Sequence, residues 1–229
     1  MGANRAVIFA NGALDDPAAT AALLRTDDWL IAADGGLRHL RAIDRAPHVL
    51  IGDLDSVSAD EVAWAEAHGT RVLRYPPEKD DTDLELALAL ARADGYKTVR
   101  IIGALGGRVD HMLGNLALLA NPALEGLDAR IIQPGTEVFL VRGQVEIEGG
   151  PGDLVSLLPV FGIAHGVTTT ALQYPLRGES LLPYRTRGIS NVMLEKRAAV
   201  SVSAGTLLCI HISRAGMEIS PPAGADAVM

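Results

Sequence analysis

Short apolar runs that end abruptly in acidic residues or glycine characterise the first half of the chain. The clearest, residues 49–51, leads directly into Gly52-Asp53-Leu54-Asp55-Ser56. Such a run, bounded by glycine and aspartate, is typical of a β-strand. Residues two apart on an extended backbone point the same way, so we expect Asp53 and Asp55 to converge on one cation while Leu54 packs inward. The alternative for this stretch is an Asx turn or a cap at Asp55-Ser56.

A cation is expected because two same-side carboxylates in one crevice repel each other unless a positive charge compensates them. Magnesium keeps several waters and takes one or two carboxylates plus substrate phosphates. This habit fits Asp53 and Asp55 better than a closed zinc cage does. The sequence therefore predicts that these two residues bind Mg²⁺.

Helical patterns alternate with the apolar runs in the first half, which indicates βαβ units and an α/β domain with a mainly parallel sheet. Asp16-Pro17 is a good helix start, and Ser58 with Glu61 forms a capping box. The expected strands are residues 6–10, 29–33, 49–51, 71–75 and 98–102, and the expected helices are 18–24, 62–67, 84–93 and 111–119.

The pattern changes after Asn121-Pro122, where short strands separated by glycine turns replace the helices. These expected strands are residues 137–142, 144–148, 154–160, 189–194, 198–202 and 207–212. We expect an all-β sandwich or barrel-like second domain. The predicted division is 1–125 for a nucleotide- and metal-binding catalytic domain and 126–229 for the β domain.

Composition restricts the partners and the compartment. The formal charge is −8 and no long basic cluster is present, which argues against a nucleic-acid partner. A single cysteine, Cys209, excludes an intramolecular disulfide and favours a reducing compartment. No run reaches the roughly 18 uncharged apolar residues of a membrane span. We therefore expect a soluble, cytoplasmic protein without a membrane partner.

Two further polar stretches border expected strands or helices of the first domain. Ala33-Asp34-Gly35-Gly36 follows a strand, and its glycines suit either close ligand approach or a simple turn. In Asp80-Asp81-Thr82-Asp83, Thr82 or Asp81 can cap the next helix. Three carboxylates exceed what capping requires, so at least one is free to bind metal or receive a proton. The alternative is a charged helix start.

The stretch from Gly103 to His111 suits phosphate binding. Its glycines permit close backbone approach, and Arg108 offers a planar donor fork for phosphate oxygens. Asp110 is either part of this site or an ion-pair partner of Arg108. His111 could be a base, a substrate partner or a helix-start residue. Because the carboxyl ends of parallel strands form one crevice, we expect all these stretches to converge.

Taken in order, these stretches resemble the thiamine pyrophosphokinase (thiamine diphosphokinase) family. The resemblance covers almost the whole chain and includes a weaker match at Gly188-Ile189-Ser190-Asn191. It implies an enzyme, specifically a transferase of thiamine diphosphate biosynthesis that uses Mg²⁺ to move the diphosphoryl group of ATP to thiamine. It also implies a homodimer whose thiamine sites lie between subunits.

The resemblance implies roles for individual residues. Metal and phosphate handling falls to Asp53, Asp55, Asp80, Asp83 and Asp110, with the metal itself on the first four. The nucleotide site implied comprises Asp34, Gly35, Gly36, Gly107, Arg108 and His111. Ser190 and Asn191 would contact thiamine.

One segment departs from the family pattern. Where the family often has glycine before a Leu-x-aromatic-x-Leu segment, this chain has Thr170-Ala171-Leu172-Gln173-Tyr174-Pro175-Leu176. Tyr174 could offer an aromatic face to the positive thiazolium of thiamine. The alternative is an ordinary half-buried tyrosine.

Other activities compete with thiamine diphosphorylation. One is a diphosphokinase for another alcohol, such as a hydroxymethylpterin, and another is a magnesium-dependent phosphohydrolase. A third is a non-catalytic nucleotide- or thiamine-binding protein. Clustering of so many ionisable groups favours an enzyme over a binding module.

Overall fold

The computed structural model describes residues 5–214 of the chain, which divides into two compact units, Met1–Pro134 and Gly135–Met229. The expected division was near residue 125. The difference arises because residues 128–133 form a strand that pairs in parallel with the strand at 98–102, and so extend the first unit. Within residues 5–214, no helix is both long and apolar enough to cross a membrane.

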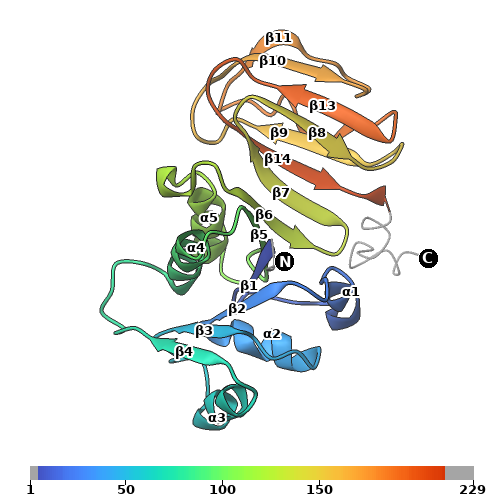
Figure 1. Ribbon diagram of the computed structural model, residues 1–229. Coiled ribbons are helices and arrows are strands. Elements are labelled where there is room, and N and C mark those ends of the chain that lie inside the picture. Colours follow the sequence, from blue (N-terminus) through green and yellow to red (C-terminus); the bar gives the residue numbers. More distant parts are fainter. Residues whose placement is uncertain (1–4, 215–229) are drawn as a thin grey trace, which may run out of the picture. The chain divides into compact units, whose positions relative to one another are not determined.

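The first unit is built on a parallel sheet, as the α/β prediction requires, with the spatial strand order β6-β5-β1-β2-β3-β4 (Figure 1). Its strands are β1 (Arg5–Phe9), β2 (Trp29–Ala33), β3 (Val49–Gly52), β4 (Arg71–Arg74), β5 (Thr98–Ile102) and β6 (Asp128–Gln133).

Both faces of this sheet are covered, so its central strands are almost wholly apolar and buried. Val7 and Phe9 belong to a core cluster that includes residues of α2 (Leu37–Ala42) and α3 (Ala59–Ala67). Helix α4 (Asp83–Ala93) contacts β1, β2 and β3 and lies on the opposite side from α2 in Figure 1. The remaining helices are α1 (Pro17–Ala21), α5 (Val109–Leu118) and the 3-10 turns η1 (Asp34–Gly36) and η2 (Pro122–Leu124).

Three helices begin where the sequence indicates. The Asp16 carboxylate accepts from the Ala19 N–H at 2.9 Å, and Ser58 forms a reciprocal capping box with Glu61. Thr82 caps α4 by accepting from the Glu85 N–H at 3.3 Å. Because Thr82 performs the capping, the aspartates around it are available for other contacts.

The strand order reverses direction between β1 and β5, since the chain runs from β1 outward to β4 and then returns to the other side of β1. Open α/β sheets bind ligands outside the carboxyl ends of the strands at such a switch point. Here those ends are joined by hydrogen bonds from the Ala10 N–H to the Ile102 carbonyl and from the Gly12 N–H to the Gly103 carbonyl. The strand order therefore predicts a ligand crevice at the carboxyl ends of β1 and β5, next to Asn11, Gly12 and Gly103.

The second unit is a β-sandwich, which confirms the all-β prediction. Strands β12, β9, β14 and β7 pair antiparallel, and so do β11, β10, β13 and β8. One core cluster draws residues from both sheets, including Phe139, Val200 and the buried Cys209. The bounds are β7 (Thr136–Val141), β8 (Gln144–Glu148), β9 (Leu154–Leu158), β10 (Ala164–Thr170), β11 (Arg177–Leu181), β12 (Asn191–Val192), β13 (Arg197–Ser201) and β14 (Leu207–Ile212).

Several elements differ from the sequence-based expectation. Strands β6, β10 and β11 and helix α2 were not expected, because their sequences are short or rich in polar residues. The strand expected at 189–194 is reduced to β12, since Ser190 adopts a left-handed φ of 56° just before it. These differences follow from tertiary pairing, which outweighs local pattern.

Candidate active site

A cleft of about 520 Å³ lies in the first unit, at the carboxyl ends of β1, β2, β3 and β5. It is the crevice that the strand order predicts. The lining includes the segments after these strands and those leading into α4 and α5: residues 10–13, 33–34, Asp53, Asp55, Ser56, Pro77, Lys79, 81–84, 103–104, 106–108, His111 and Asn115.

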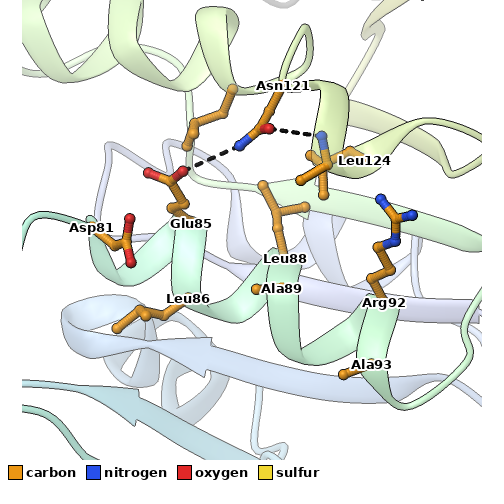
Figure 2. Close-up of a pocket in the computed structure, with 11 residues that line it drawn as sticks. Asp81, Glu85, Leu86, Leu88, Ala89, Arg92, Ala93, Asn121 and Leu124 are labelled. Atoms are coloured by element: carbon orange, nitrogen blue, oxygen red, sulfur yellow. Dashed lines mark hydrogen bonds between the residues drawn. The ribbon is translucent and has the colours of Figure 1, made fainter.

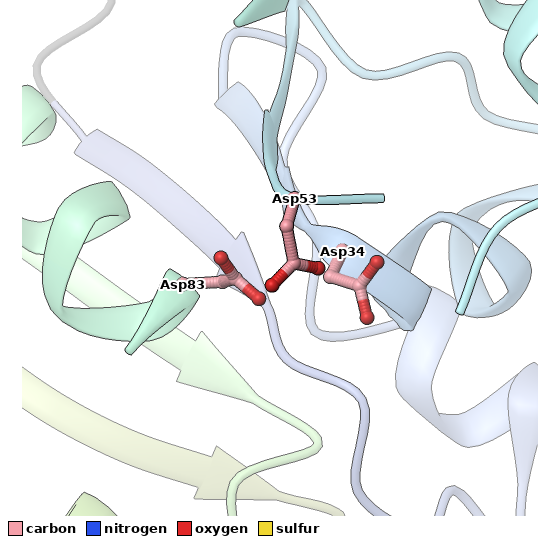
Figure 3. Close-up of side chains that lie close together, drawn as sticks. All are labelled: Asp34, Asp53 and Asp83. Atoms are coloured by element: carbon pink, nitrogen blue, oxygen red, sulfur yellow. The ribbon is translucent and has the colours of Figure 1, made fainter. Parts of the chain in front are cut away.

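Three carboxylates converge in this cleft. Asp34, Asp53 and Asp83 each offer an oxygen within 4.8 Å of the others. Figure 3 shows them approaching from the end of β2, the end of β3 and the start of α4. Three anionic groups at this spacing suit a divalent cation with oxygen ligands, such as Mg²⁺.

Asp34 is the most constrained member of the cluster. It is only 6 % exposed and adopts a left-handed φ of 47°, which is unfavourable for a residue other than glycine. Among the residues that the structure describes, its Oδ1 has no hydrogen-bond partner. A buried, unpartnered carboxylate oxygen is costly, so it fits a position completed by a bound ion.

Lys79 supplies the positive charge of the cluster. Its Nζ lies 2.9 Å from Asp53 Oδ2 and 3.0 Å from Asp83 Oδ1. Its side chain is 13 % exposed, compared with 14 % for Asp53 and 21 % for Asp83. Lys79 directly precedes the acidic stretch Asp80-Asp81-Thr82-Asp83, and no role was predicted for it from the sequence.

The electrostatics of the two lysine partners differ. The hydrogen bond from Lys79 holds the pKa of Asp53 below its ordinary value. Burial raises the pKa of Asp83 despite the same lysine, and the neighbouring carboxylates add to this effect. Burial alone would lower the pKa of Lys79, but its two carboxylate partners outweigh burial and raise it.

Glycines are required at three positions beside the three-carboxylate cluster, because a Cβ at any of them would clash with a neighbouring group. A Cβ on Gly52 would lie 2.9 Å from the Asp83 carboxyl carbon, and Gly52 has a φ of 146°. A Cβ on Gly36 would lie 1.9 Å from the Phe9 carbonyl oxygen, and one on Gly35 would lie 2.2 Å from the Asn11 side chain. Gly35 and Gly36 therefore pack η1 against the segment after β1. They do not line the cleft.

Asp53 and Asp55 do not converge by strand alternation. Strand β3 ends at Gly52, and Leu54 adopts a φ of 64°. The Asp55 N–H donates to Asp53 Oδ1 at 3.2 Å, which is the Asx-turn geometry considered as an alternative. Both acids line the cleft, but Asp55 lies outside the three-carboxylate cluster. Leu54 packs inward as expected.

The acidic stretch before α4 is also divided. Asp83 enters the carboxylate cluster, and Asp81 lines the cleft. Asp80 is exposed and belongs to neither group. The tertiary structure thus selects Asp83 from the acids of this stretch.

Arg108 and His111 line the cleft, as does Gly107. Arg108 forms a 2.6 Å ion pair with Asp110, and both side chains are largely exposed. The pair lowers the pKa of Asp110 to about 2, with help from the His111 N–H. Asp110 therefore remains ionised at neutral pH and orients Arg108, rather than joining the carboxylate cluster.

Sequence reasoning missed residues that shape the cleft floor. Asn11 and Gly12 line it after β1, and His39 Nε2 lies 2.8 Å from the Gly12 carbonyl. Asn115 of α5 donates to the Ala104 carbonyl at 2.9 Å. The available signal was the polar Asn11-Gly12 pair directly after a strand, the same signal that singled out Asp53.

The predicted thiamine contacts lie in the second unit and form a cluster of their own. Asn191 is 6 % exposed, and its side-chain amide bonds to the backbone of Tyr174. Tyr174 is 64 % exposed as a residue, so it is not the half-buried tyrosine of the alternative interpretation. Ser190 is exposed, and its N–H donates to Ser156 Oγ at 3.0 Å.

A second hollow, of about 530 Å³, lies along α4 near η2 (Figure 2). Leucine and alanine side chains form most of its lining, and Asn121 donates to Glu85 Oε1 at 3.2 Å at one end. It shares only Asp81 with the cleft. Without converging carboxylates or glycine loops, it does not suit a phosphate group.

Comparison with known proteins agrees with this geometry. Residues 20–131 match the thiamin pyrophosphokinase catalytic domain, and residues 144–207 match the thiamin pyrophosphokinase vitamin B1 binding domain. A thiamine pyrophosphokinase of Bacillus subtilis is 31 % identical over 183 residues, which are 79 % of this chain and 86 % of the relative. The chain belongs to the thiamine pyrophosphokinase family.

Solved structures of the thiamine pyrophosphokinase family share the fold. One from Bacillus subtilis has a TM-score of 0.82 at 27 % identity, covering 91 % of this chain and 99 % of that one. One from Enterococcus faecalis has a TM-score of 0.77 at 29 % identity, covering 91 % and 98 %. The expectations of family, fold class and an enzyme are thereby confirmed.

Proposed function

We propose that this protein transfers the β,γ-diphosphoryl group of ATP to the hydroxyl of thiamine, forming thiamine diphosphate and AMP. The proposal rests on family membership together with one observation, the convergence of Asp34, Asp53 and Asp83 in the switch-point cleft. Transfer of a phosphoryl-type group requires mainly alignment and charge stabilisation. A crevice that combines carboxylates, glycine loops and an arginine supplies both.

Asp34, Asp53 and Asp83 would hold Mg²⁺, and the unpartnered Asp34 oxygen is the feature that fits an ion. The bound metal would neutralise phosphate charge during transfer. Asp55 lies in the same cleft and is the next candidate ligand. Asp80 is the weakest of the proposed metal ligands, since its exposed side chain lies outside the lining.

Arg108, Gly107 and His111 would bind the phosphates of ATP. The φ of Gly107 is 69°, and a Cβ there would meet nothing within 4 Å, so the backbone is open to a ligand. Asp110 accepts from Nε and Nη2 of Arg108 at 3.2 and 2.6 Å, so the N–H groups on the other edge of the guanidinium would bind phosphate. Asp110 would therefore act on phosphate through Arg108.

Thiamine would bind in the second unit at Tyr174 and Ser190. The exposed Tyr174 ring suits a positively charged thiazolium, because aromatic faces attract cations. Asn191 would position Tyr174 rather than contact thiamine itself, since its side-chain amide is bonded to the Tyr174 backbone.

A homodimer in the cytoplasm is the assembly that we propose. Support comes from α5, where Val109 is 64 % and Leu113 is 58 % exposed. Large apolar side chains exposed on one helix are typical of an association surface. Light scattering after gel filtration should give a dimer mass, and Leu113→Glu should shift it toward the monomer.

A phosphorus NMR time course with ATP, Mg²⁺ and thiamine tests the activity. Thiamine diphosphate and AMP should appear together. ADP with thiamine monophosphate would indicate single phosphoryl transfer, and inorganic phosphate would indicate hydrolysis. A parallel sample with a hydroxymethylpterin in place of thiamine should remain unchanged, and product formation there would favour the competing diphosphokinase.

A further inference from the structure

Lys79 occupies the point at which two of the three clustered carboxylates meet. Its Nζ contacts Asp53 Oδ2 at 2.9 Å and Asp83 Oδ1 at 3.0 Å. With 13 % exposure, the lysine side chain is almost enclosed. Both contacts use oxygens of the residues proposed to hold the metal, so the lysine and an ion draw on the same ligands.

The charges of the cluster do not balance. Three carboxylates face one ammonium group, and the buried Asp34 Oδ1 has no partner among the described residues. The cluster therefore retains attraction for a further cation. That cation would have to enter beside the like charge of Lys79, which repels it at this short range.

We propose that Lys79 is a built-in cation that competes with the divalent metal for Asp53 and Asp83. It holds the carboxylates together when metal is absent and weakens the binding of metal alone. This inference deepens the proposed function, because it assigns a role to one more residue at the same site. An anionic nucleotide offers the displaced ammonium a new partner, so metal and nucleotide should strengthen each other's binding.

The first test is a titration of the full-length protein with Mn²⁺ alone, with free ion followed by electron paramagnetic resonance. Mn²⁺ accepts the same oxygen ligands as Mg²⁺. Lys79→Met should lower the dissociation constant for Mn²⁺ by about tenfold or more, because the competing positive charge is gone. Lys79→Arg should remain close to wild type. Lys97→Met, which removes an exposed lysine outside the cleft lining, controls for net charge.

Equal or weaker Mn²⁺ binding by a folded Lys79→Met protein would overturn the proposal. This readout needs neither thiamine nor turnover, so it can fail or succeed separately from the diphosphoryl-transfer assay. A methionine variant that binds tightly but forms no AMP would support the lysine's role in metal binding and leave the reaction to be judged by the NMR experiment.

The second test uses the wild-type chain and so does not depend on the folding of a variant. Acetic anhydride labels free lysine amines, and mass spectrometry compares Lys79 with Lys97. Metal should raise the labelling of Lys79 several-fold relative to Lys97, since the ion releases its ammonium group from two carboxylates. Unchanged or reduced labelling at saturating metal would contradict displacement.

Discussion

The side-chain amide of Asn191 holds the backbone of Tyr174 on both sides. Its Oδ1 accepts from the Tyr174 N–H at 2.9 Å, and its Nδ2 donates to the Tyr174 carbonyl at 2.8 Å. The same Oδ1 also accepts from the Val192 N–H at 3.0 Å. Asn191 thus acts on the proposed thiamine site by positioning an exposed aromatic ring.

Asn191→Ala should therefore raise the KM for thiamine more than the KM for ATP. It should also lower the free energy of unfolding by about 1–3 kcal/mol, because buried backbone groups lose their partners. Steady-state AMP formation and denaturant unfolding measure the two effects. Tyr174→Phe should leave the thiamine KM nearly unchanged, whereas Tyr174→Ala should raise it as Asn191→Ala does, because the aromatic ring is lost. An unchanged thiamine KM in a folded Asn191→Ala protein would show that Asn191 does not position Tyr174 for thiamine binding.

Ala171, which directly precedes the segment Leu172-Gln173-Tyr174-Pro175-Leu176, adopts a left-handed φ of 57°. Ala171→Gly should leave stability unchanged or increase it, since relief of a cost of about 1–2 kcal/mol offsets the lost methyl contact and the added freedom of the unfolded chain. Ala199→Gly within β13 should instead lose about 0.5–1 kcal/mol. Urea denaturation compares the pair, and equal losses would show that the left-handed backbone carries no strain.

The acids before α4 and after β3 should differ in importance. Asp53→Asn should reduce the transfer rate on the order of 100-fold or more, as removal of a stabilising electrostatic group typically does. Asp80→Asn should cost at least tenfold less, because Asp80 is exposed and outside the cleft. Asp94→Asn, at the far end of α4, serves as the matched control. If Asp80→Asn were as damaging as Asp53→Asn, the placement of the metal would be wrong.

Stability should fall as the pH drops below about 6.5, and His48 should contribute to the fall. Burial lowers the pKa of His48 from the ordinary value of 6.5, and its Nδ1 accepts from the Leu30 N–H, which a protonated ring could not do. At pH values between the folded and the unfolded pKa of His48, the unfolded chain binds one more proton than the folded chain. The free energy of unfolding therefore rises with pH across this window, and the contribution of His48 to stability is complete above the unfolded pKa.

His48→Asn can keep an acceptor for Leu30 but cannot titrate. Thermal unfolding measured from pH 5 to pH 8 should therefore show a shallower pH dependence in this variant. Some slope should persist, because burial also lowers the pKa of His39. An identical slope in both proteins would exclude His48 as a contributor.

The sequence predicted several helix starts of the first unit correctly, because helix capping depends on residues close together in the chain. Thr82 caps α4 and Ser58 begins α3 because side-chain oxygens satisfy the first free N–H groups of a helix. Strand β10 was missed because its Ala-His-Gly-Val-Thr-Thr-Thr sequence carries few large apolar residues. Its pairing with β11 and β13 decides its structure.

The sequence alone determined which segments carry the chemistry, because glycine and aspartate directly after short apolar runs mark strand ends in a parallel sheet. Tertiary structure decided which of their side chains meet. Asp34 joins Asp53 and Asp83 because the strand order sets β2 beside β3 and α4 across both. Asp55 lines the same cleft but lies outside this three-carboxylate cluster, because the chain turns at Leu54, whose φ is left-handed. Lys79 lies four residues before Asp83, so that contact is local. Its contact with Asp53, 26 residues earlier, depends on the tertiary structure, which brings the segment before α4 to the end of β3.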